Sequence, residues 1–132
     1  MSRASAVLLV DDEPVVLDSL RRQMRLMCGD GLQVECAESV SEAWEVMAEM
    51  QAEGVSVLLI ISDWLMPLIR GDAFLEEVKA RFPEVKRVML TGQADGAALR
   101  RVRDGGFVDR LLFKPWSVQE LAEVVGMVGT DG

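Results

Sequence analysis

Five short apolar segments, separated by longer segments in which apolar residues recur every three or four positions, constrain the fold of this chain. The clearest is 57–61, which is apolar throughout. Runs of this length fit β-strands, and the spacing between them fits helices. Strict alternation of the two predicts an α/β fold with a doubly wound parallel sheet. The fully apolar run is expected near the centre of the sheet, where both faces are buried.

Glycine, proline and capping residues place the expected elements more closely. Strands are expected at 6–10, 32–36, 57–61, 88–91 and 108–113, with 32–36 at an edge because polar and apolar residues alternate there. Helices are expected from Pro14 to Gly29, from Ser39 to Gly54, after Gly71-Asp72 as far as Pro83, from Ala97 to Arg103, and after Ser117. Ser39 with Glu42, and Ser117 with Glu120, have the spacing of capping boxes.

Composition bounds the class of protein. The 132 residues, half of them hydrophobic, fit a single domain, 1–132, with a core from about 5 to 128 and no output domain. The net charge of −8 opposes binding to nucleic acid or an anionic membrane but not to a divalent cation. No run approaches the roughly 20 apolar residues of a membrane span, and no signal peptide is visible, so a cytoplasmic location is expected. Histidine is absent, which excludes histidine-based catalysis.

Charged side chains follow three of the predicted strands directly. Asp11 and Asp12 follow 6–10, Asp63 follows 57–61 after one serine, and Lys114 follows 111–113. The carboxyl ends of parallel strands meet at one edge of the sheet, where ligands of such folds bind. Three carboxylates repel one another unless a cation joins them, and Mg²⁺ prefers oxygen ligands. The sequence therefore predicts a magnesium site at this edge.

Each of these residues has a simpler explanation when taken alone. Acids cap helix N-termini, a lysine at a strand end is commonly solvated, and Thr91 after the fourth strand fits an ordinary turn. Two adjacent acids exceed what a cap needs, however. A carboxylate at the position of Asp63 can also act as a nucleophile towards phosphorus. The four elements are weak singly but specific as an ordered set at four strand ends.

The chain resembles a response-regulator receiver domain of two-component signalling over nearly its whole length. The resemblance is carried by Val10-Asp11-Asp12-Glu13-Pro14, Ser62-Asp63-Trp64-Leu65-Met66-Pro67, Met89-Leu90-Thr91-Gly92 and Phe113-Lys114-Pro115-Trp116. It implies a flavodoxin-like fold with five strands in the order 2-1-3-4-5 and five helices. It also implies a cis bond between Lys114 and Pro115.

The resemblance implies roles for the site residues as well. Asp63 would be the phosphoacceptor, and Thr91 and Lys114 would hold the phosphoryl oxygens. Asp12, Asp63 and the backbone carbonyl of Leu65 would bind Mg²⁺, with Asp11 acting through a water molecule. Such a domain is not an enzyme beyond its self-catalysed phosphoryl transfer and slow autodephosphorylation.

The implied partners are proteins. A histidine kinase or phosphotransfer protein would donate the phosphoryl group. An output domain or partner protein, or a second copy forming a homodimer, would bind the face made by the fourth helix, fifth strand and fifth helix. No direct contact with nucleic acid or membrane is expected.

Four positions depart from the family pattern or adjust it. Leu111 stands where most receivers carry a switching Tyr or Phe, which weakens the usual signal transmission, although Phe113 points the same way. Arg70 stands where a small polar residue is usual, and it would steer a partner or pair with a neighbouring acid. Leu65 and Gln93 occupy positions that tune phosphate lifetime, and the bulk of Leu65 predicts slow dephosphorylation.

Three other readings remain open at this point. An interaction domain that works without phosphorylation would keep the fold, and Leu111 leaves room for it. A Mg²⁺-dependent aspartyl phosphohydrolase would normally carry a second acid two residues after Asp63, where this chain has Leu65. A flavodoxin-like cofactor binder is disfavoured because 11–14 would repel a phosphate.

Overall fold

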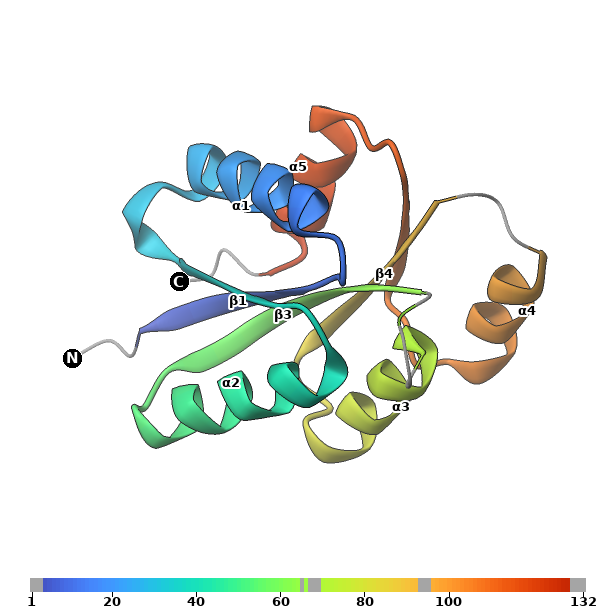
Figure 1. Cartoon of the computed structure of the whole chain (residues 1–132), viewed down its shortest axis with the longest axis horizontal. Helices are drawn as coiled ribbons and strands as arrows, with labels where there is room; N and C mark the ends of the chain where they lie inside the picture. Colours follow the sequence, from blue (N-terminus) through green and yellow to red (C-terminus); the bar gives the residue numbers. More distant parts are fainter. Residues whose placement is uncertain (1–3, 65, 67–69, 93–95, 129–132) are drawn as a thin grey trace.

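The computed structural model describes residues 4–64, 66, 70–92 and 96–128, which form five β-strands, five α-helices and one short 3₁₀ helix (Figure 1). Along the chain these are β1 (Ser5–Val10), α1 (Pro14–Cys28), the 3₁₀ helix η1 (Gly29–Gly31), β2 (Gln33–Ala37), α2 (Val40–Ala52), β3 (Ser56–Asp63), α3 (Gly71–Arg81), β4 (Lys86–Thr91), α4 (Gly96–Gly105), β5 (Arg110–Phe113) and α5 (Val118–Gly126).

The strands form one parallel sheet in the order β2-β1-β3-β4-β5. This confirms the expected fold and the edge position of the second strand. Helices α1 and α5 cover one face of the sheet, and α2, α3 and α4 lie on the other (Figure 1). No helix in the described part of the chain combines the length and apolar character needed to cross a membrane.

Two main hydrophobic clusters hold the layers together. One contains Leu20 of α1 and Leu121 of α5, and the other contains Phe74 of α3 together with residues of α2. Neighbouring β3 residues divide between them, since Ile61 belongs to the first cluster and Ile60 to the second. The central strand is therefore apolar throughout because both of its faces are covered, as expected for this class of sheet.

Helix ends agree in part with the expected caps. The Ser117–Glu120 capping box is complete, because each side chain accepts a hydrogen bond from the other residue's backbone N–H. Ser39 accepts from the N–H of Glu42, but the carboxylate of Glu42 accepts from the N–H of Glu38 instead of closing the box. Only half of the first predicted box forms.

Several elements differ from their predicted bounds. Strand β5 starts at Arg110, two residues later than expected. Just before it, the N–H of Asp109 donates to the Arg87 carbonyl, and the Asp109 carboxylate accepts the N–H of Arg87, both at 2.7 Å. Helix α4 extends one residue before and two beyond 97–103. Helix α3 begins at Gly71 itself, ahead of the predicted start.

Candidate functional site

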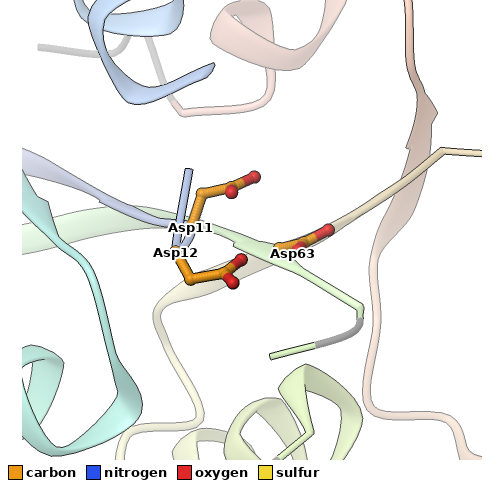
Figure 2. A group of neighbouring side chains, drawn as sticks. All are labelled: Asp11, Asp12 and Asp63. Carbon is orange, nitrogen blue, oxygen red and sulfur yellow. The ribbon is translucent and has the colours of Figure 1, made fainter. Parts of the chain in front are cut away.

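The three acids predicted to meet at the sheet edge do so. Asp11 and Asp12 follow β1, and Asp63 ends β3, which pairs with β1. Figure 2 shows the three carboxylates projecting from these strand ends. One carboxylate oxygen from each residue lies within 4.8 Å of the other two. The parallel pairing of β1 with β3 thus brings the three negative charges together.

Two of these acids are buried. Asp11 has no exposed surface and Asp63 is 7% exposed, whereas Asp12 is exposed. Burial, reinforced by the negative charge of Asp11, raises the pKa of Asp63 to about 6 against the opposing effect of Lys114. Burial also raises the pKa of Asp11 above its ordinary value. The site therefore holds its negative charges at an energetic cost.

Lys114, just beyond β5, brings the positive charge. Its Nζ lies 3.2 Å from Asp11 Oδ2 and 3.3 Å from Asp63 Oδ1, and 3.4 Å from Glu13 Oε1. Burial disfavours the ammonium, but Asp11 and Asp63 outweigh that effect and raise the pKa of Lys114. Lysine and acids are thus mutually stabilised across strands β1, β3 and β5.

The residues present fit a hard divalent cation. One ammonium against the three clustered carboxylates leaves two negative charges when all four groups are ionised. Asp11 Oδ1 accepts the N–H of Glu13 at 2.8 Å, while the buried Oδ2 accepts no well-formed hydrogen bond within the described residues, although Lys114 is close. Oxygen ligands and excess negative charge are what Mg²⁺ requires. The expected Leu65 carbonyl ligand lies outside the described residues, as does Gln93.

Thr91 ends β4 beside this cluster. It is 2% exposed, and its carbonyl accepts the N–H of Lys114 at 2.7 Å. Its neighbour Leu90 pairs with Asp63 in the sheet register. The expected cis peptide bond joins Lys114 to Pro115. The structure thus places Thr91 at the same sheet edge as the acids and the lysine.

The backbone around Asp63 is tightly packed. The N–H of Gly71 donates to the carbonyl of Trp64 at 3.0 Å. A Cβ built on Gly71 would stand 1.8 Å from the carbonyl oxygen of Asp63, so only glycine fits. Trp64 itself is 5% exposed. The start of α3 therefore lies directly against the backbone of Asp63.

Two contacts near the site bear on the sequence analysis. Arg70 donates to both carboxylate oxygens of Asp72, at 3.1 and 3.2 Å. This confirms the prediction that Arg70 could pair with a neighbouring acid. Glu13 was missed as a partner of Lys114. Its position directly after the two aspartates is the only sequence signal that would have indicated it.

Residues 7–126 match the family model described as the response regulator receiver domain. The chain belongs to this family. A receiver domain is a signalling module, and this agrees with the resemblance carried by the strand-end motifs.

Individual relatives extend the match. This receiver domain is 34% identical over 127 residues to the sensor kinase CckA of Brucella abortus (strain 2308), covering 95% of the chain and 12% of the kinase. It is 32% identical over 128 residues to the response regulator Rre1 of Synechocystis sp., covering 95% of the chain and 52% of the regulator. The chain thus spans about half or less of the length of these two curated relatives.

A solved structure gives the same result. The signal receiver domain of an HD domain-containing protein from Pseudomonas fluorescens Pf-5 superposes with a TM-score of 0.83 at 26% identity, covering 96% of this chain and 94% of that one. Curated relatives therefore include both a kinase and a regulator, and the shared part is the receiver domain.

Proposed function

We propose that this receiver domain accepts a phosphoryl group on Asp63 in the presence of Mg²⁺. The observation that carries the proposal is the position of Asp63, a buried carboxylate beside Asp11 and Asp12 with the ammonium of Lys114 3.3 Å away. The donor would be a histidine kinase or a phosphotransfer protein. Residues from about 5 to 128 would form the core of one such domain.

The chemistry follows from the groups present. An oxygen of the Asp63 carboxylate attacks phosphorus, the bond from phosphorus to the donor atom breaks with its electrons staying on the donor, and an acyl phosphate results. The ammonium of Lys114 and the hydroxyl of Thr91 would then hold the new phosphoryl oxygens. Mg²⁺ held by Asp11, Asp12, Asp63 and the Leu65 carbonyl would neutralise the charge on the incoming group.

The protonation state of Asp63 suits this role. In the metal-free domain, a pKa of about 6 leaves the carboxylate mostly ionised at neutral pH, so the nucleophile is available. A bound cation would favour the ionised form further. Burial of Asp63 thus does not prevent its ionisation.

Net hydrolysis is a less favoured reading. The position two residues after Asp63, where an aspartyl phosphohydrolase would carry its second acid, is Leu65. We therefore infer that the domain is not a turnover enzyme and loses the phosphoryl group slowly. A receiver-fold interaction domain that ignores phosphorylation is the second candidate, favoured by the absence of an aromatic side chain at Leu111, which is half-buried against the α2–α3 side of the core.

The output would be a change in protein binding. Phosphorylation adds negative charge at the sheet edge and would alter the face formed by α4, β5 and α5. That face would bind an output domain or partner protein, or a second copy of the chain.

The decisive experiment is intact mass measurement after incubation with Mg²⁺ and acetyl phosphate. We expect one phosphoryl group on the wild-type chain, none on Asp63→Asn, and none when the metal is removed by EDTA. Asp104→Asn, an exposed aspartate far along the chain, is the matched control and should accept the group normally.

Two results would contradict the proposal. An adduct that persists in Asp63→Asn would show that another residue is the acceptor. No adduct under conditions that trap short-lived species would favour the interaction domain. A half-life of seconds for the acyl phosphate would overturn the inferred slow loss alone.

A further inference from the structure

Asp72, in the first turn of α3, is a buried carboxylate that the proposed phosphoryl chemistry does not use. Its side chain has no exposed surface. Two arginines supply its partners: Arg70 binds both oxygens, and Arg101 of α4 donates from Nε at 3.0 Å. A buried carboxylate is costly unless such partners surround it. The contact with Arg101 spans 29 residues of sequence and joins α3 to α4.

Asp72 is also connected to the phosphoacceptor. The preceding residue, Gly71, lies against the Asp63 carbonyl with no room for a side chain, and its N–H is bonded to Trp64. The guanidinium of Arg70 lies 5.3 Å from the centre of the Trp64 ring while it holds Asp72. Backbone contact and a shared arginine thus lead from Asp63 to Asp72.

Helix α4 depends on polar contacts for its position. Each of its residues whose side chain is described is at least partly exposed. Arg101 provides several of its tertiary contacts, since it binds Asp72, reaches Glu76 at 3.4 Å, and lies 5.2 Å from the centre of the buried Phe107 ring. Val102 adds partial packing against the core. A helix with so little buried apolar surface can move when such a contact breaks.

We propose that Asp72 and Arg101 form a latch that couples the state of Asp63 to the position of α4. The proposal rests on the phosphorylation of Asp63 inferred above. A phosphoryl group adds bulk and negative charge at Asp63, and any shift of the Asp63 backbone is passed to Gly71 by the close contact. Such a shift moves Asp72, the next residue, relative to Arg101 and breaks their contact, so the latched state is that of the unmodified domain.

Hydrogen exchange of the α4 amides tests the latch. The probe is Mg²⁺ with beryllofluoride, a stable mimic of the phosphoryl group on aspartate. In the wild type we expect the mimic to accelerate exchange in 96–105 by about tenfold. Asp72→Asn should show the faster exchange without the mimic and no further response to it. Arg103→Gln is the matched control, because Arg103 is on the same helix, is 73% exposed and pairs with its neighbour Asp104.

A second measurement is the affinity for beryllofluoride, which a contact with a purely structural role would not change. If the latch favours the unmodified state, breaking it should tighten beryllofluoride binding, by about fivefold at the lower end of common coupling. Arg101→Gln, a change at a partly exposed side chain, should do the same and covers the case in which Asp72→Asn fails to fold. The effect of the double variant should be smaller than the sum of the two single effects, because both single variants remove the Asp72–Arg101 contact.

The outcomes separate this inference from the proposed function. If the wild type accepts a phosphoryl group but α4 responds alike in the wild type, Asp72→Asn and Arg101→Gln, the latch is overturned and the phosphoacceptor role stands. If the wild type accepts no phosphoryl group, both fall. Tighter binding in both latch variants, with Arg103→Gln unchanged, supports the latch.

Discussion

Asp63 ionises at a cost because its side chain is buried beside Asp11. The folded protein holds its pKa at about 6, whereas the ordinary value is 3.8. Protonation of Asp63 therefore favours the folded state. The stability it contributes is fully present below pH 3.8 and is lost as the pH rises through about 6.

Stability measurements on the metal-free protein should show this dependence. Between pH 4 and pH 7, Asp63→Asn should gain stability relative to the wild type, because asparagine stays neutral. A shift of roughly two pKa units corresponds to at most about 3 kcal/mol. Urea unfolding in EDTA across this pH range measures the difference, with Asp104→Asn as the exposed control. If the difference in free energy of unfolding between Asp63→Asn and the wild type stayed constant across this pH range, the raised pKa of Asp63 would be contradicted.

Sequence reasoning located residues whose position follows from strand ends. Asp11, Asp63 and Lys114 were found because parallel strands carry their carboxyl ends to one edge. Asp72 and Arg87 were not recognised as buried, although the side chain of each is almost fully enclosed. Their burial depends on partners such as Arg101 and the Phe107 carbonyl, which lie 29 and 20 residues away. A local sequence pattern cannot predict contacts between residues so far apart in the chain.

Helix α3 is positioned by its first residue. The sequence indicated Gly71 only as a residue that precedes the helix, because its constraint comes from the Asp63 carbonyl and not from its own φ angle. The predicted start of α3 was late for the same reason. Element boundaries of this kind depend on tertiary contact, whereas the Ser117–Glu120 box is local and was predicted fully.

Replacing Gly71 with alanine should therefore disrupt the site. The added Cβ would force the backbone of Asp63 to move, and we expect the free energy of unfolding to fall by about 3 kcal/mol, the upper end of the usual cost of overpacking. Phosphorylation by acetyl phosphate should fall with it. Gly126→Ala is the control, because nothing lies within 4 Å of its Cβ position in α5, and stability there should stay equal or rise by under about 1 kcal/mol. Equal stability of Gly71→Ala and the wild type would refute the packing argument.

The whole molecule is acidic, and three of its carboxylates gather at one edge of the sheet. The chain carries a net charge of −8, and the three clustered carboxylates exist as a group only after folding. A cation that binds this group binds the folded state alone and stabilises it by mass action. Such site-specific binding of a cation should be distinguishable from the general screening of surface charges by salt.

Mg²⁺ should accordingly raise the stability of the wild type at pH 7, by about 2.7 kcal/mol at a hundred times its dissociation constant. Asp12→Asn should lose most of this gain, while Glu45→Gln, at an exposed position on α2, should keep it. Thermal unfolding with NaCl at matched ionic strength measures the effect. Equal stabilisation of all three proteins by Mg²⁺ would indicate screening and not a site.

The overall topology was accessible from the sequence in two steps. Alternation of apolar runs and helical spacing predicted the parallel sheet, and the family resemblance supplied the order of strands. The order itself has no local signature, because β1 pairs with β2 and β3 while β3 pairs with β4. The alternation of apolar runs and helical segments thus predicted the α/β class, whereas the order of the strands came from the family resemblance.

The residues of the site span Asp11 to Lys114 and come from the ends of four strands, β1, β3, β4 and β5. No short peptide fragment contains Asp63 together with Lys114 and Asp11, and a chain cut between β3 and β5 lacks the assembled cluster. If Asp63 accepts a phosphoryl group as proposed above, a donor that recognises this geometry would transfer the group only to chains that are folded from Asp11 to Lys114.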